Sequence, residues 1–232
     1  MTSFLRLDYH RVLTTMTTDV EKPVSEETIR KALGEFQIPT DSKQVVLIQQ
    51  YIKTLLRWND KLNLTAIRSP LEILYRHFCE SMFAAGAIPV DKGRLADIGS
   101  GPGFPGIPLK IMRPELELCL VEANVKKGTF LAEIVRELQL TNSRVLISRY
   151  EELGEELAPL DFVCSRAVGE FGPFLEWAGS NRVDASQVIL WIGGRDLEEA
   201  RKSKEWEWRE PILIPKSLQR YLLVGKKKEM SA

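Results

Sequence analysis

One short segment contains the residues whose types and spacing most clearly indicate chemistry. Residues 97–106 read Asp-Ile-Gly-Ser-Gly-Pro-Gly-Phe-Pro-Gly. Glycines let a backbone approach a ligand closely and adopt positive φ. Residues 101–106 satisfy the G-x-G-x-x-G pattern of dinucleotide-binding loops, which alone is weak evidence. Pro102 and Pro105 also remove N–H groups that such a loop donates to a pyrophosphate.

An acidic residue followed by three alternating glycines resembles instead the cofactor loop of S-adenosylmethionine methyltransferases. That cofactor has no phosphates, so the loss of N–H donors costs it little. Its ammonium could pair with the carboxylate of Asp97 or with a loop carbonyl. We therefore predict a methyltransferase that binds S-adenosylmethionine at Asp97, Ser100 and Gly101.

A second acidic residue, Glu122, ends the next predicted strand, where its carboxylate could accept both ribose hydroxyls of a cofactor. NAD enzymes share this arrangement, so Glu122 does not choose between the two cofactors. An NAD-dependent oxidoreductase therefore remains an alternative. Residues 149–151, Arg-Tyr-Glu, follow the third predicted strand, where their backbone could frame an adenine ring.

Other polar residues have both a functional and a structural interpretation. Arg166 follows a strand at the edge where substrates dock, or forms a structural ion pair. Asn63 faces the target base or ends a helix, and His77 contacts RNA or lies partly buried in its helix. Lys126 and Lys127 bind an external anion or form a solvated helix face.

The residues before the glycine loop have helical patterns. An amphipathic stretch covers 25–36, and Asp41 with Gln44 resembles a capping box before a helix that ends near Trp58. Ser69 followed by Pro70 predicts the start of a third helix, which runs to about residue 85.

The pattern changes at Gly93, where short strands begin to alternate with helices. The strands are predicted at 94–98, 116–122, 145–148, 161–165 and 188–192, and the helices at 107–113, 126–140, 171–178 and 196–204. This alternation predicts an α/β, Rossmann-like fold with a mainly parallel sheet. Residues 208–214 and 219–224 predict an antiparallel C-terminal hairpin, followed by a solvated lysine tail at 226–228.

Composition sets the broad class of the protein. Its 232 residues predict a flexible tail at 1–22, a helical extension at 23–90 and a cofactor-binding domain at 91–232. Lys plus Arg and Asp plus Glu each number 32, so RNA binding would depend on local clusters of cations. The three cysteines are widely spaced, which predicts buried thiols in a cytoplasmic protein and no metal site. No secretory signal or membrane span is expected, and we expect a monomer.

Several segments resemble the bacterial small-subunit ribosomal RNA methyltransferase G family, also called glucose-inhibited division protein B. The segments are 58–65, Arg76-His77, 97–108, 126–131, 148–151 and 165–167, and the resemblance covers about 40–225. It implies N7-methylation of a guanine in the 530 loop of 16S rRNA, within free rRNA or a small-subunit intermediate. It also implies cofactor contacts at Gly99, Phe104, Tyr150, Glu151 and Arg166.

Guanine N7 has a lone pair and no proton, so this reaction needs no general base. Arg166, Asn63 and His77 are then expected to position the substrate. The family usually has lysine before a glycine at the end of the fifth strand, where this chain has Gly193, and Arg195 could substitute for it. It also more often has Asp where this chain has Glu80. The missing lysine motivates a further alternative, a non-catalytic protein that binds rRNA or the ribosome.

Overall fold

The computed structural model describes residues 24–166 and 169–228, so the predicted tail at 1–22 lies outside the described residues. The helices are α2 (Glu26–Glu35), α3 (Ser42–Leu62), α4 (Pro70–Ile73), the π-helical η1 (Leu74–Cys79), α5 (Glu80–Ala87), α6 (Gly106–Met112), α7 (Val125–Glu137), the 3₁₀ turn η2 (Tyr150–Glu152), α8 (Phe171–Gly179) and α9 (Leu197–Arg201). The strands are β1 (Gly93–Ile98), β2 (Leu116–Val121), β3 (Ser143–Leu146), β4 (Leu160–Ser165), β5 (Ala185–Gly193), β6 (Trp206–Trp208), β7 (Ile212–Leu213) and β8 (Arg220–Lys227).

The first helices begin where their capping residues predict. The Asp41 side chain accepts from the N–H of Gln44 and the Gln44 side chain accepts from the N–H of Asp41, which confirms the capping box. Helix α3 continues past the predicted end near Trp58 to Leu62. It ends because Asn63 adopts the left-handed conformation, with φ 50°.

The third helix also begins as predicted, with Ser69 as the N-cap and Pro70 in the first position. It continues to Ala87, but its middle, η1, is π-helical. Such wide turns often occur at functional sites. η1 contains both Arg76 and His77.

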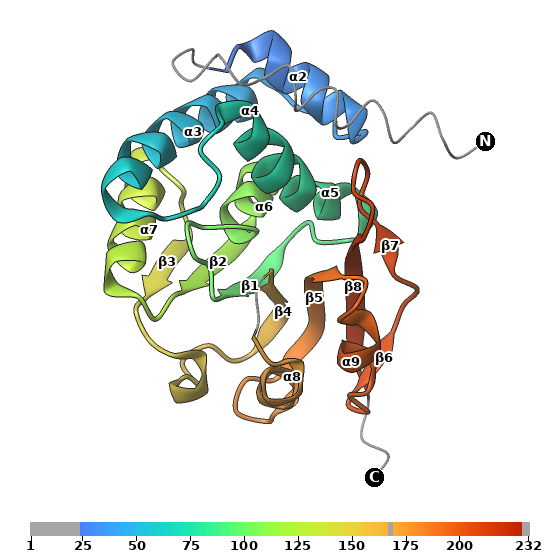
Figure 1. Cartoon of the computed structure of the whole chain (residues 1–232). Coiled ribbons are helices and arrows are strands. Elements are labelled where there is room, and N and C mark those ends of the chain that lie inside the picture. Colours follow the sequence, from blue (N-terminus) through green and yellow to red (C-terminus); the bar gives the residue numbers. More distant parts are fainter. Residues whose placement is uncertain (1–23, 167–168, 229–232) are drawn as a thin grey trace, which may run out of the picture.

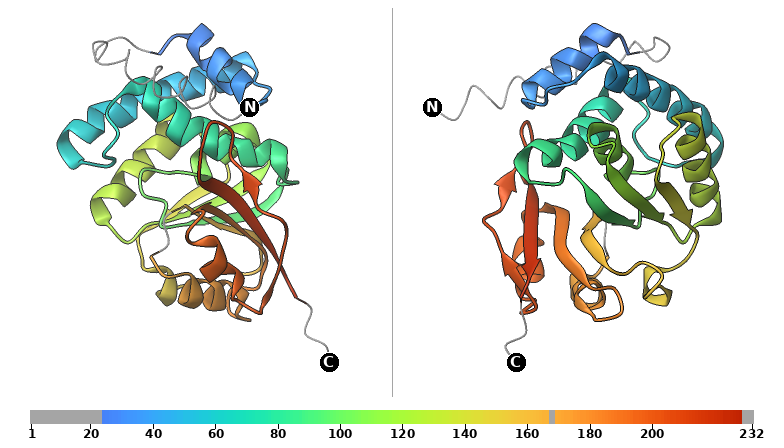
Figure 2. Two further views of the ribbon diagram at one scale, coloured as in Figure 1. Left: turned by 45° about the vertical axis from the view of Figure 1, so that its right-hand side comes forward. Right: turned by 180° about the vertical axis from the view of Figure 1, so that it is seen from behind.

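The strands form one sheet in the order β3-β2-β1-β4-β5-β8-β6, with β7 paired to β8 (Figure 1). The pairs among β1 to β5 are parallel, whereas β8 runs antiparallel to β5, β6 and β7. The predicted α/β fold with an antiparallel C-terminal hairpin is therefore confirmed. Figure 2 shows the hairpin closing one edge of the sheet while the N-terminal helices cover the top of the molecule.

Alternate residues of the central strands face two hydrophobic cores. Leu95 of β1 packs toward α2, α3, α6 and α7, whereas Ala96 and Ile98 pack toward α8 and α9. The first core also contains Leu33 and Tyr51 of the N-terminal helices, so both predicted regions share it. The division of the chain near residue 90 stays a prediction.

The C-terminal predictions need two corrections. The expected strand 208–214 is interrupted by Pro211, because proline lacks the N–H that a ladder needs, and the structure has β6 and β7 instead. The expected tail at 226–228 was wrong for its first two lysines. Lys226 and Lys227 pair within β8, and Lys227 lies 3.1 Å from the Asp184 carboxylate.

Candidate functional site

The glycine loop leaves the carboxyl end of β1, and Asp97 anchors it from inside. Its side chain is fully buried, and Oδ2 accepts a 2.9 Å hydrogen bond from the N–H of Gly106. Burial raises the pKa of Asp97 to about 7, while the hydrogen bond from Gly106 opposes that rise. The carboxylate thus holds the two ends of the loop together, and its contact with a cofactor stays a prediction.

The N–H groups of the loop donate hydrogen bonds to acceptors within the protein. Ser100 donates to the carbonyl of Val121, Gly101 to the carboxylate of Glu122, and Gly106 to Asp97. The N–H groups of Gly103 and Phe104 both reach the carbonyl of Ser100. Together with the two prolines, this pattern leaves few N–H donors for a pyrophosphate. The loop therefore does not suit a dinucleotide.

Glu122 lies at the carboxyl end of β2, directly beside the loop. Its Oε2 accepts from Gly101 and its Oε1 from the N–H of Asn124, both at 2.8 Å. Two backbone donors thus hold the carboxylate of a residue that is 8% exposed. This position suits an acceptor of ribose hydroxyls.

Phe104 closes the other side of the loop as the centre of an aromatic stack. Its ring lies parallel to that of Tyr51, 5.3 Å between centroids, and His77 stacks on it at 4.6 Å. The Tyr51 hydroxyl also donates a hydrogen bond to the carbonyl of Pro102. α3 and η1 therefore fix the conformation of the loop through the side chains of Tyr51 and His77.

His77 is neutral in this setting. Burial, together with the nearby charges of Arg166 and Arg76, lowers its pKa to about 3. Its Nε2 lies 3.0 Å from the Thr65 hydroxyl, whereas its buried Nδ1 has no hydrogen-bond partner in the protein. A neutral imidazole can orient a polar group at physiological pH but cannot contribute a charge.

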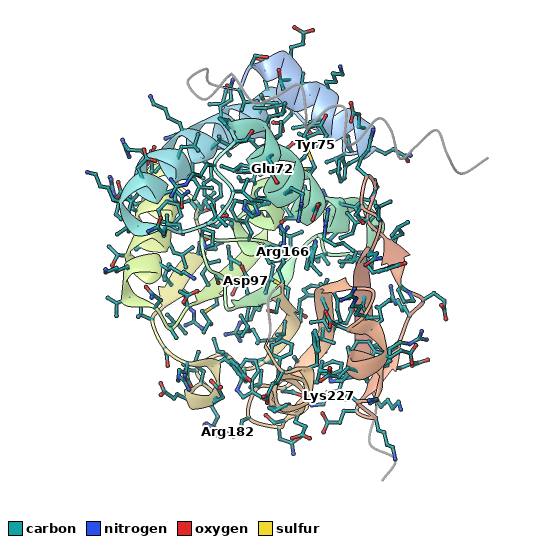
Figure 3. The ribbon with its side chains drawn as sticks, viewed as in Figure 1. Glu72, Tyr75, Asp97, Arg166, Arg182 and Lys227 are labelled. Atoms are coloured by element: carbon teal, nitrogen blue, oxygen red, sulfur yellow. The ribbon has the colours of Figure 1, made fainter. Side chains whose placement is uncertain are left out.

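Arg166 is the residue directly after β4, close to Asp97. Figure 3 shows both residues near the middle of the molecule, below the N-terminal helices. Arg166 donates a 3.2 Å hydrogen bond to the buried carboxylate of Glu80. Arg220 binds the same carboxylate, with Nε 2.9 Å from Oε2. The structural interpretation of Arg166, an ion pair, is therefore confirmed, whereas its contact with a substrate or cofactor stays a prediction.

The remaining predicted residues lie farther out. Asn63 caps α3 and accepts a hydrogen bond from Arg68, so its contact with a base stays a prediction. The Tyr150 ring packs edge-on against Trp177, and Glu151 is exposed. Lys126 is exposed in the first turn of α7.

The described residues show no arrangement for a metal or a membrane. Among 24–166 and 169–228, no group of three His, Cys, Asp or Glu side chains could hold a metal ion. Over the same residues, no helix is both long and apolar enough to cross a membrane. Cys79, Cys119 and Cys164 are buried free thiols, as their spacing predicted.

Comparison with known proteins identifies the family. A family model described as rRNA small subunit methyltransferase G matches residues 44–219. The chain belongs to this family. A ribosomal RNA small subunit methyltransferase G from Xylella fastidiosa (strain M23) is 50% identical over 192 residues, covering 81% of this chain and 89% of the relative. A protein of the same name from Chloroflexus aggregans is 40% identical over 185 residues, covering 78% of this chain and 72% of the relative.

A solved structure supports the fold. M. capricolum TrmK, in complex with the cofactor product S-adenosyl-homocysteine, superposes with a TM-score of 0.51 at 17% sequence identity. It covers 64% of this chain and 68% of TrmK. At this identity the likeness shows the fold alone.

Two residues of the site were missed by the sequence analysis of this methyltransferase G family member. Glu80 was noted only as a departure from the family pattern, although a charge within the apolar run of residues 78–85 was a signal for a buried ion pair. Arg220 gave no signal, because its partner lies 140 positions earlier in the chain. Arg195, the expected substitute for the missing lysine, is exposed in the turn after β5, whereas Arg220 pairs in register with Gly193.

Proposed function

We propose that the protein transfers a methyl group from S-adenosylmethionine to N7 of a guanine in the 530 loop of 16S rRNA. Family membership supports methylation of small-subunit rRNA. The observation that supports the cofactor is the glycine loop, whose N–H groups are bound within the protein and whose Gly101 donates to the carboxylate of Glu122. When bound, S-adenosylmethionine supplies a methyl group on a positively charged sulfur.

Different residues around the loop would bind different parts of that cofactor. Glu122 would accept the ribose hydroxyls, because its carboxylate is already oriented by two backbone N–H groups. The backbone of Tyr150 and Glu151 would frame the adenine. The exposed backbone at Gly99 offers a carbonyl for the ammonium, with Asp97 holding the loop behind it.

The proposed reaction needs no proton transfer from the protein, because guanine N7 carries a lone pair and no proton. The residues of the site would therefore serve to hold the base against the methyl group that the cofactor would supply. With a pKa of about 3, His77 would be a poor proton acceptor, which agrees with a reaction that needs no general base. His77, Asn63 and Arg166 would orient the base, and Lys126 and Lys127 would contact RNA phosphates.

The first test measures cofactor affinity by titration calorimetry with Glu122→Gln. Glu117→Gln is the matched control, because Glu117 lies in β2, the strand directly before Glu122, with its side chain largely exposed. We expect the Glu122 change to weaken S-adenosylmethionine about tenfold through the loss of charge-assisted hydrogen bonds, and the control to bind normally. Binding of NAD in place of S-adenosylmethionine would contradict the proposal.

The second test identifies the product. Small-subunit rRNA from a strain that lacks the modification is incubated with enzyme and cofactor, then cleaved with borohydride and aniline, which cut at N7-methylguanine. Cleavage in the 530 loop is the expected result. Cofactor and RNA binding with no cleavage would instead support the non-catalytic alternative.

A further inference from the structure

A buried carboxylate holds three arginines together beside the glycine loop. Glu80, the first residue of α5, has a side chain that is 3% exposed. Its oxygens accept from Arg166 at 3.2 Å and from Arg220 at 2.9 and 2.5 Å, and Arg76 Nε lies 3.4 Å away. We call these four residues the arginine cluster. They come from η1, α5, the end of β4 and the start of β8.

The arginine cluster has more positive charge than its single carboxylate can balance. Three guanidinium groups face one carboxylate, and the neighbouring His77 is neutral. Burial lowers the pKa of Arg166, Glu80 opposes this, and the charges of Arg220 and Arg76 add to the lowering, so that the pKa is about 10. Partly buried charge without a partner is costly, so this excess indicates an anion that the cluster is built to receive.

Unpaired polar atoms lie in the same region. Arg166 Nη1, His77 Nδ1 and Ser81 Oγ are all buried and lack a hydrogen-bond partner in the protein. His77 and Ser81 are one helical turn apart on the continuous helix formed by η1 and α5. Buried polar groups are almost always hydrogen-bonded, so each of these atoms calls for a partner from outside the chain.

The arginine cluster is both accessible and close to the reaction site. The side chains of Arg76 and Arg220 are each 31% exposed, and that of Arg166 is 18% exposed. The charges of Arg76 and Arg166 lower the pKa of His77, and the His77 ring stacks on Phe104 of the glycine loop. A ligand held by these arginines would therefore lie next to the cofactor.

We propose that the arginine cluster binds a phosphate group of the RNA substrate, with Glu80 as the positioning residue that holds the guanidinium groups. This inference rests on the proposed function for the identity of the substrate. Guanidinium forks match phosphate geometry and bind it with two parallel hydrogen bonds. The other candidate anion is the carboxylate of S-adenosylmethionine, but that molecule also carries a sulfonium and an ammonium. A cluster with excess positive charge would repel both of these groups.

The first experiment uses inorganic phosphate as the probe. The unfolding temperature of the full chain is measured with roughly 20 mM phosphate and with chloride at equal ionic strength, both with and without saturating S-adenosylmethionine. We expect phosphate to raise the unfolding temperature by about 3 °C, with or without cofactor. Arg220→Gln should lose this shift. Arg182→Gln, an exposed arginine far from the cluster in Figure 3, should keep it.

Two further variants keep the test decisive if Arg220→Gln does not fold. Arg220→Lys retains the charge but loses the bidentate geometry, and Arg76→Gln removes a different arginine from the cluster. Both should reduce the shift. No shift in the unchanged protein, or an equal shift in every variant, would overturn the proposal.

The second experiment separates RNA phosphate from the cofactor carboxylate. The affinity of Arg220→Gln for S-adenosylmethionine is measured by calorimetry, and its affinity for an rRNA fragment at several salt concentrations. We expect cofactor affinity to change less than threefold, and the slope of log affinity against log salt to fall by about one. A tenfold loss of cofactor affinity with an unchanged slope would assign the cluster to the carboxylate and overturn the proposal. The affinity of the unchanged protein for S-adenosylmethionine is measured separately. That result tests the proposed function independently of the arginine cluster.

Discussion

Two buried carboxylates of the candidate site, Asp97 and Glu80, are stabilised differently. Asp97 accepts from one backbone N–H, and the Cys164 thiol lies 3.7 Å from its other oxygen. Glu80 is bound by guanidinium groups. Asp97 thus organises a loop with almost no compensating charge, whereas Glu80 organises cations. A buried carboxylate can therefore hold the backbone of a loop at one position and a group of cations at another.

The largest expected effect concerns the titration of Asp97. Its pKa of about 7 in the fold lies above the ordinary value of 3.8, so its stabilising contribution is complete below pH 4 and is lost as the pH rises to 7. Over that interval we expect the free energy of unfolding to fall by about 4 kcal/mol relative to Asp97→Asn. Urea unfolding at several pH values measures this difference. Parallel pH profiles for the two proteins would contradict it.

Glu80→Gln tests the other carboxylate. Without its charge, three guanidinium groups repel one another in a partly buried space, and we expect the free energy of unfolding to fall by about 3 kcal/mol. The midpoint of urea unfolding gives the value. Glu72→Gln is the control, because Glu72 lies in the preceding helix α4, outside the cluster. A loss of under about 0.5 kcal/mol would mean that the cluster does not depend on Glu80.

Substitutions at two glycines test how tightly the loop anchored by Asp97 is packed. Gly103 has φ +97°, and an added Cβ would clash with the Tyr51 hydroxyl; Gly99 has φ +67° and open space around it. We expect Gly99→Ala to cost about 1 kcal/mol in backbone strain and Gly103→Ala about 2 kcal/mol more. Thermal unfolding compares them. Equal losses would show that the loop relaxes freely.

Tyr51→Phe should have the smallest effect. It removes the hydrogen bond to the Pro102 carbonyl and keeps the ring stacked on Phe104. We expect a loss of about 1 kcal/mol in unfolding free energy, with weaker cofactor binding because the loop is less constrained. Calorimetry with S-adenosylmethionine provides the second readout. Unchanged stability together with unchanged affinity would show that the stack alone positions the loop.

The sequence by itself determined the fold class and the position of the loop. Strand and helix alternate with the expected periods after Gly93, and the capping residues Asp41 and Ser69 begin their helices as predicted. These signals are local, because capping and periodicity act over a few residues. The family could be recognised for the same reason, from short motifs such as residues 97–108.

Only the tertiary structure decided which partners each charged group meets. The sequence does not reveal that the fold buries Asp97 against the N–H of Gly106, and the predicted contact of Asp97 with a cofactor stays a prediction. Glu80, Arg166 and Arg220 come from three distant parts of the chain, and no local pattern predicts that they meet. Charge compensation depends on distance and burial after folding, and these arise from the packing of the whole sheet and its helices.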